Sequence, residues 1–267
     1  MSSEYLNLEE DTYSDSAYQE YKQGDDLVEW IKTHKTQEYV HLDSKNLNND
    51  QVKVIVNELK ANKQWKYVNL SDNKILGGTS GQYLADALMV NEGLETLDLS
   101  KTSLLDEGLQ LISRSLKMNT KTHLSELTLV GNGITDVGCQ YISEMLMENI
   151  ALHNLYLDNN LIGDAGLTSL AVAVKINNTN SNPGLSHVSI KNNKISDNSV
   201  NIIIDLFENS RLDQLILDGN EISAEGIKRL RLVFADKLYA ENLISLSRNP
   251  PEAGGVQGGG YALGLKG

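Results

Sequence analysis

The sequence predicts an α/β solenoid, a right-handed coil of repeated strand–helix units that forms one elongated domain. The first observation is the phrase apolar-x-apolar-x-x-Asn-x-apolar, which recurs at a nearly constant interval along the chain. The second is an amphipathic helix pattern that follows each phrase at a constant offset. A fixed period of this kind is typical of repeat proteins, in which each unit buries its apolar face against its neighbours. Clear copies of the phrase begin at Val68, Leu127, Leu155, Val188 and Leu215, and weaker ones at Val40, Leu97 and Ile244.

Each unit reads as a short strand followed by a helix. In the unit that starts at Leu124, alternate residues of the phrase point inward, as a half-buried strand requires. Farther along, Cys139, Ile142 and Leu146 share one helical stripe behind Gly138. Because all units connect strand to helix in the same way, we expect a parallel sheet on the concave side of a horseshoe and helices on the convex side.

The asparagine of the phrase predicts a ladder of hydrogen bonds. Its amide can both donate and accept, so it can satisfy backbone groups where each strand turns towards its helix. Lys45 and Thr102 stand at this position in two units, where we expect the ladder to be incomplete. The predicted ladder consists of Asn73, Asn132, Asn160, Asn193, Asn220 and Asn249.

The repeat resembles a known family. The pattern L-x-x-L-x-L-x-x-N-x-I-x-D-x-G is followed by a full helix. This combination is similar to the ribonuclease-inhibitor-like class of leucine-rich repeats. The resemblance covers residues 37–249, as seven repeats plus a terminal strand, and implies the horseshoe fold. It does not select a function, because the class includes inhibitors, actin-filament cappers, GTPase activators, immune sensors and ciliary scaffold subunits.

The two ends differ from the repeats. Residues 1–24 form an acidic arm that contains four tyrosines, which fits either a solvated tail or an arm that docks on a basic partner. Residues 25–36 are predicted to be a capping helix over the first repeat. Residues 250–267 are a glycine-rich tail. We expect neither the arm nor the tail to contribute to the repeat core.

Composition narrows the partners and the compartment. The net charge of −13 repels phosphate backbones, so we expect no nucleic acid and favour a protein partner with a basic surface, in a multiprotein complex. No apolar run is long enough to span a bilayer, and the first residues show no secretion signal, so no membrane is expected. The single cysteine, Cys139, fits a reducing compartment. These features indicate the cytoplasm, with the cytoskeleton or a cilium as a narrower possibility.

The sequence contains no pattern typical of an enzyme. It has no nucleophile elbow, no H-E-x-x-H and no paired C-x-x-C, so we expect no catalysis, no cofactor and no metal. The glycine-rich segment 77–81 lacks the G-K-[ST] ending of a phosphate-binding loop. His41 and His187 should both reach the concave face, but they lie five repeats apart, too far to share a metal.

The concave face is the candidate binding site. Acids outnumber the one base on it, Lys191, and several tyrosines there are costly to expose without a purpose. A solvated polar face is the alternative, since an uncovered sheet must be polar. The candidate partner-binding residues are Tyr39, His41, Asp43, Tyr67, Asp98, Glu126, Tyr156, Asp158, His187 and Asp218.

Two functions remain open. The first is a non-catalytic scaffold subunit of a larger assembly, because a small chain of seven repeats without another domain resembles the scaffold subunits of ciliary axonemes. The alternative is a GTPase activator, because the phrases at 68–73 and 155–160 are similar to those of the Ran GTPase-activating proteins. That resemblance implies that Asn73 would orient the catalytic machinery of the GTPase. Actin-filament capping of the tropomodulin kind ranks lower, because the long actin-binding helical region is missing.

Overall fold

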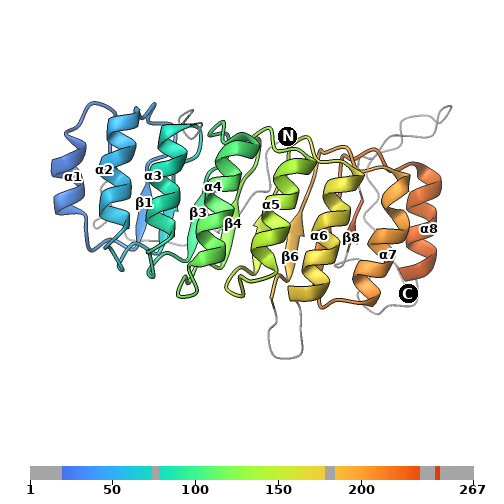
Figure 1. Cartoon of the computed structure of the whole chain (residues 1–267). Coiled ribbons are helices and arrows are strands. Elements are labelled where there is room, and N and C mark those ends of the chain that lie inside the picture. The colour runs from blue at the N-terminus through green and yellow to red at the C-terminus, as the bar shows by residue number, and fades with distance from the viewer. Residues whose placement is uncertain (1–19, 74–77, 178–183, 235–243, 247–267) are drawn as a thin grey trace, which may run out of the picture.

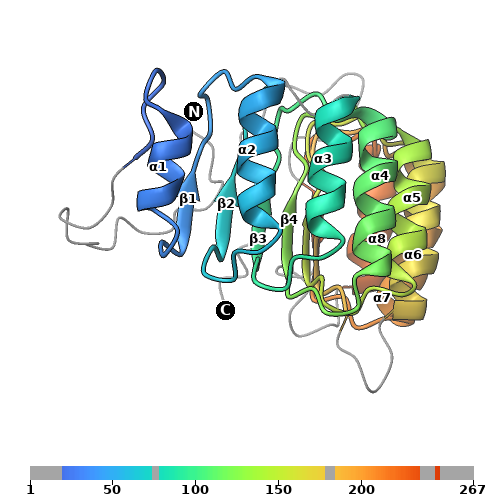
Figure 2. The ribbon, with the colours of Figure 1, turned by 60° about the vertical axis from the view of Figure 1, so that its left-hand side comes forward.

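The computed structural model describes residues 20–73, 78–177, 184–234 and 244–246. Eight strands form one parallel sheet in chain order, from β1 to β8. The helices pack side by side in a second layer that covers one side of this sheet, and the units curve so that the strands lie inside (Figures 1 and 2). The predicted α/β solenoid is therefore confirmed.

The elements alternate along the whole described chain. The strands are β1 (Tyr39–His41), β2 (Tyr67–Asn69), β3 (Thr96–Asp98), β4 (Glu126–Thr128), β5 (Asn154–Tyr156), β6 (His187–Ser189), β7 (Gln214–Ile216) and β8 (Ile244–Ser245). The helices are α1 (Leu27–Thr33), α2 (Asn49–Leu59), α3 (Thr79–Leu88), α4 (Leu105–Met118), α5 (Asp136–Leu146), α6 (Asp164–Asn177), the 3-10 helix η1 (Asp197–Ser199), α7 (Val200–Glu208) and α8 (Ala224–Phe234).

The core lies between the sheet and the helices. The middle residue of each strand from β1 to β7 points into it, and Leu97 pairs in register with Val68 on one side and Leu127 on the other. All three of these side chains are at most 1% exposed. Because the strands never shift register, each side chain of a strand stands beside its equivalent in the next unit.

The asparagines of the phrase bind the units to one another at the strand ends. Asn132 Nδ2 donates to the Leu99 carbonyl of the preceding unit at 2.8 Å, and its Oδ1 accepts from the N–H groups of Thr102 at 3.0 Å and Leu104 at 3.1 Å. Asn160 makes the matching bonds to the unit of Asn132. These amides satisfy backbone groups that no strand or helix bond reaches. Asn249 lies outside the described residues.

The two positions without asparagine differ from expectation. Thr102 is fully buried, and its hydroxyl donates to the Leu99 carbonyl at 2.7 Å and contacts Asn132 Oδ1 at 3.0 Å. The predicted gap at Thr102 is therefore only partial, because the hydroxyl makes the bond to its own strand. Lys45 instead pairs with Glu20, which comes from the chain before the first helix.

A second row of asparagines joins the helix ends. Asn119 Nδ2 donates to the carbonyls of Leu88 at 2.8 Å and Asn91 at 2.7 Å, both in the preceding unit. Helix ends leave carbonyls without an internal partner, and this amide satisfies them. Sequence reasoning missed this row, which comprises Asn62, Asn91, Asn119, Asn149 and Asn177.

A row of aspartates joins the helix starts. Asp136 Oδ1 accepts from the N–H groups of Gly163 at 2.6 Å and Gly166 at 2.9 Å in the next unit. A carboxylate at this place also interacts favourably with the helix dipole. A Cβ on Gly166 would lie 2.6 Å from Asp136 Oδ1, so this close approach requires a glycine at position 166. Asp106, Asp164 and Asp197 make comparable bonds to the units that follow them.

The N-terminal end is closed by α1 and the residues just before it. Asp26 caps α1 by accepting from the N–H groups of Val28 at 2.9 Å and Glu29 at 3.2 Å. Tyr21 is 1% exposed, and its ring centroid lies 5.7 Å from that of Trp30. The expectation that residues 1–24 add nothing to the core is therefore wrong at Tyr21. Residues 1–19 of the arm and the 250–267 tail lie outside the described residues.

We predict that replacing Asn132 with Leu lowers the free energy of unfolding by about 1–3 kcal/mol, because buried backbone groups lose their partners. Thr102→Val removes one hydroxyl from the same junction and should lower the free energy of unfolding by a smaller amount. Chemical denaturation of both variants measures the difference. Equal losses would show that the amide has no special part in the junction.

Candidate protein-binding face

Two rows of side chains run along the concave surface of the sheet. The strand register aligns Tyr39 with Tyr67 in the first row and His41 with Asn69 in the second. Parallel strands lie about 4.8 Å apart, so equivalent side chains of neighbouring units touch or nearly touch. The first row is Tyr39, Tyr67, Thr96, Glu126, Asn154, His187 and Gln214, and the second is His41, Asn69, Asp98, Thr128, Tyr156, Ser189 and Ile216.

The first four strands bring six of the predicted site residues together. The ring centroid of Tyr67 lies 6.0 Å from that of Tyr39 and 5.1 Å from that of His41. Burial and the charges of three carboxylates raise the pKa of the Tyr67 hydroxyl; the carboxylates are Asp98 on β3, Glu126 on β4, and Asp43, which follows β1. We call this group the acidic–aromatic patch; it consists of Tyr39, His41, Asp43, Tyr67, Asp98 and Glu126.

The residues of the patch carry net negative charge at neutral pH. Burial is the largest influence on the pKa of His41 and lowers it, so the imidazole is neutral near neutral pH despite Asp43 at 4.0 Å. Burial, followed by the charges of Asp98 and Asp43, raises the pKa of Tyr67 to about 12. Burial also raises the pKa of Asp98, although Ser100 donates two hydrogen bonds to its carboxylate. Such partly desolvated carboxylates gain most from an approaching cation.

Two further predicted residues lie next to this patch, and one of them is not exposed. Tyr156 is half-buried, and its pKa is raised by burial and by the charge of Glu126. Asp158 is fully buried, and its Oδ1 accepts from Ser189 Oγ at 2.5 Å and from the Lys191 N–H at 2.6 Å. The prediction that Asp158 offers its carboxylate to a partner is therefore wrong. It lies beyond the end of β5 and holds the loop of the next unit.

The remaining two candidates stand apart. His187 on β6 has its Nδ1 2.8 Å from Ser186 Oγ, and Asp218 follows β7. Both are half-buried. His187 lies two strands away from Glu126 and Asp218 lies farther still, so they do not extend the acidic–aromatic patch.

The described residues offer little for other chemistry. Across residues 20–73, 78–177, 184–234 and 244–246, His, Cys, Asp and Glu side chains form no group of three that could hold a metal ion. Burial raises the pKa of the Cys139 thiol, which packs in the core. Among the helices that the structure describes, none has the length and apolar character needed to cross a membrane.

Comparison with known proteins agrees with this architecture. A family model described as "Leucine Rich repeat" matches residues 120–143. NACHT, LRR and PYD domains-containing protein 14 of Homo sapiens is 30% identical over 148 residues, or 46% of this chain and 13% of that protein. NACHT, LRR and PYD domains-containing protein 4C of Mus musculus is 32% identical over 157 residues, or 49% of this chain and 16% of that protein. The fold and these matches define a leucine-rich-repeat solenoid.

The matches cover a small part of the relatives. NACHT, LRR and PYD domains-containing protein 5 of Homo sapiens is 27% identical over 206 residues, which make up 66% of this chain but 17% of that protein. This chain thus spans less than a fifth of the length of these relatives. The solved structure "Leiomodin-1 Actin-Binding Site 2 (ABS2)" superposes with a TM-score of 0.45 at 18% identity, covering 57% of this chain and 87% of that chain.

We predict that Asp98→Asn raises the free energy of unfolding at neutral pH. The native pKa of Asp98 lies above its ordinary value of 3.8, so the native state binds the proton more tightly than the unfolded state. The Asp98 carboxyl therefore contributes to the free energy of unfolding at a pH below 3.8, and this contribution is lost as the pH rises through the native pKa. The asparagine can still accept from Ser100. Urea unfolding at neutral and at strongly acidic pH should show a gain that disappears in acid; a variant that is less stable at both would contradict this.

Proposed function

We propose that this protein is a non-catalytic interaction module that binds a protein with a basic surface through the acidic–aromatic patch. The observation that carries the proposal is the contact of Tyr39, Tyr67 and His41 beside three carboxylates. Tyr39 remains 46% exposed within this group. Aromatic rings flanked by carboxylates suit the side chains of lysine and arginine, which gain from the ring faces and from the charge.

The wider setting of the proposal is a scaffold. We assign the repeats to the ribonuclease-inhibitor-like class, because most units carry a full α-helix between successive strands. The narrower version is a cytoplasmic subunit of a multiprotein complex, with the ciliary axoneme as the specific assembly. It rests on the resemblance of these repeats to those of axonemal scaffold subunits. Imaging of the tagged protein in its source cell tests that location.

The surroundings of Asn73 weigh against the alternative GTPase activator. Asn73 is fully buried. Its amide donates to the Leu42 carbonyl at 2.7 Å and the Leu70 carbonyl at 3.0 Å, and its Oδ1 accepts from the Leu47 N–H at 3.1 Å. A fully buried amide bonded in this way is poorly placed to orient the machinery of a bound GTPase.

We predict that neutralising three acids of the patch weakens binding of the partner. The variant Asp43→Asn, Asp98→Asn, Glu126→Gln should lose on the order of tenfold in affinity at low ionic strength, because three favourable charges are removed. The loss should shrink at high ionic strength, where exposed charges are screened. Affinity capture followed by mass spectrometry identifies the partner, and calorimetric titration of the two purified proteins measures the effect.

The control removes the same charge from the helices. Glu107, Glu148 and Glu208 are exposed on α4, after α5 and on α7, and their joint replacement by Gln changes the net charge equally. This control should bind like the wild type. If it loses affinity while the patch variant keeps it, the binding face is on the convex side and the proposal fails.

We predict that Asn73→Ala affects stability alone. It should lower the free energy of unfolding by about 1–3 kcal/mol, because the carbonyls and the N–H that it satisfies become unpaired. The wild-type protein should not accelerate GTP hydrolysis by a purified Ran-type GTPase. Stimulation that depends on Asn73 would reverse the choice between the two functions.

A further inference from the structure

The convex side carries exposed apolar side chains at equivalent places in four consecutive repeats. They lie at the C-terminal ends of α3, α4, α5 and α6, and Met89, Met118, Met147 and Ile176 follow one another at equal intervals along the chain. The helices stand side by side in Figure 1, so these ends form one edge of the layer. We call this edge the methionine edge; it comprises Met89, Val90, Met118, Met147, Ile150 and Ile176, which are 38–64% exposed.

The fold does not require apolar residues at this edge. The flanking repeats have Lys60 after α2 and Glu208 at the end of α7, both exposed, and their helices pack in the same layer. Large exposed apolar patches on soluble proteins typically mark sites that bind another molecule. Methionine is typical of surfaces that bind helices, because its flexible thioether adapts to the occupant.

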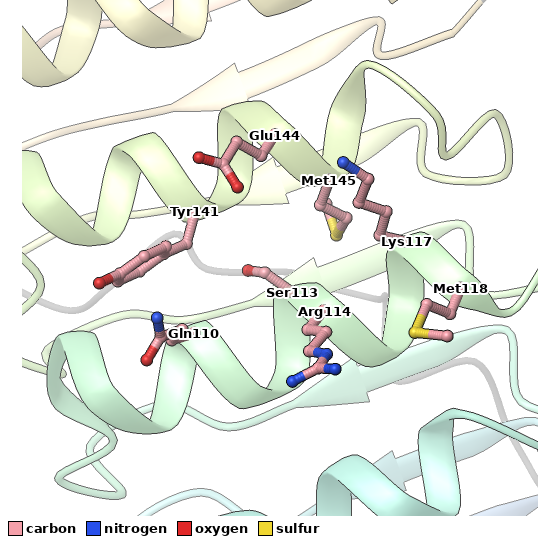
Figure 3. Close-up of a pocket in the computed structure, with 8 residues that line it drawn as sticks. All are labelled: Gln110, Ser113, Arg114, Lys117, Met118, Tyr141, Glu144 and Met145. Carbon is pink, nitrogen blue, oxygen red and sulfur yellow. The ribbon is translucent and has the colours of Figure 1, made fainter.

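A groove between α4 and α5 opens from the methionine edge. Its volume is about 340 Å³, and Met118 belongs to both features. Figure 3 shows Ser113 between the two helices, with Tyr141 and Glu144 on the α5 side. Ser113 Oγ is buried and has no hydrogen-bond partner in the described part of the chain. A buried hydroxyl left unpaired is unfavourable, so the contact of α4 with α5 is not fully satisfied beneath the groove.

The walls of the groove indicate the charge of the occupant. Arg114 and Lys117 stand exposed on the α4 side, and among the described residues neither forms an ion pair. Glu144 stands on the α5 side, also outside those pairs. Two such cations on one wall of a protein with net charge −13 favour an occupant that places acids over α4 and keeps them away from Glu144.

We propose that the methionine edge binds an amphipathic α-helix of another protein that crosses the end of this groove, with its apolar stripe on the methionines and acidic residues towards Arg114 and Lys117. Neighbouring helices lie about 10 Å apart, so the four helix ends span roughly 30 Å. A helix of about 20 residues has that length. Helix-in-groove binding uses apolar anchors at positions i, i+3 or i+4, and i+7. This surface lies on the helix layer, opposite the acidic–aromatic patch on the strands, and does not depend on it.

The test uses a synthetic labelled peptide and the full chain. The peptide has about 20 residues, which span about 30 Å as a helix, with leucines along one helical stripe and glutamates along one flank. Fluorescence anisotropy should show binding by the wild type. Met118→Gln with Met147→Gln should weaken binding about tenfold, because two apolar anchors are lost. The matched control, Val137→Gln with Leu161→Gln, changes side chains of similar exposure in the first turn of α5 and in the loop before α6, and it should bind normally.

A second variant tests the charges without touching the apolar residues. A peptide with lysines in place of the glutamates should bind the wild type about tenfold more weakly, and Arg114→Gln with Lys117→Gln should remove this preference. No binding of the glutamate peptide by the wild type overturns the proposal, and so does an equal loss in the matched control. Sedimentation showing a wild-type dimer that the Met118 and Met147 changes dissociate would assign the edge to a second copy of this chain instead.

Discussion

The structure depends on polar backbone groups that one unit cannot satisfy and its neighbour can. Three rows of side chains supply the missing bonds: one asparagine row at the strand ends, aspartates at the helix starts and a second asparagine row at the helix ends. Buried backbone groups are nearly always paired, so these bonds define how each unit sits on the next. Apolar packing alone would allow neighbouring units to slide, because it has no preferred direction.

This fixed stacking is what turns repeated positions into surfaces. Tyr39 and Tyr67 are one full repeat apart in the chain, yet their rings touch because the strands stay in register. On the other side, the same stacking lines up Met89, Met118 and Met147. The two surfaces differ in kind: the strands present acids and aromatic rings, whereas the helix ends present apolar side chains beside two cations. Under the two proposals made above, one chain would hold two chemically different partners on opposite sides.

The sequence predicted the fold because the strand alternation and the helical stripe are visible within one unit, and both recur along the chain at a nearly constant period. It also predicted the strand-end asparagines, which stand at a constant place in the phrase. The asparagines at the helix ends were missed because their distance from the start of the next repeat varies. Asn91 lies three residues before Leu94, which precedes the phrase at Leu97, whereas Asn177 lies eight residues before Leu185, which precedes the phrase at Val188. Asp158 was misplaced because strand alternation ends with β5 at Tyr156, and the chain beyond it turns inward. The groove between α4 and α5 could not be predicted, because its lining side chains come from two neighbouring units and the sequence pattern describes one unit at a time.

The contact between Asp136 and Gly166 has a consequence for how such a chain can change in length. The carboxylate belongs to one unit and the glycine to the next. The units of α5 and α6 each carry both an aspartate and the glycine, whereas the unit of α7 has Ser199 at the glycine position. Duplication or loss of the unit of α5 therefore joins an aspartate to a glycine again, and the new junction has the same contact as the old. A point change at the glycine has the opposite effect, since it blocks one junction while leaving the length unaltered. At these junctions a whole turn can be repeated with its contacts kept, whereas a methyl group on Gly166 would displace the carboxylate of Asp136.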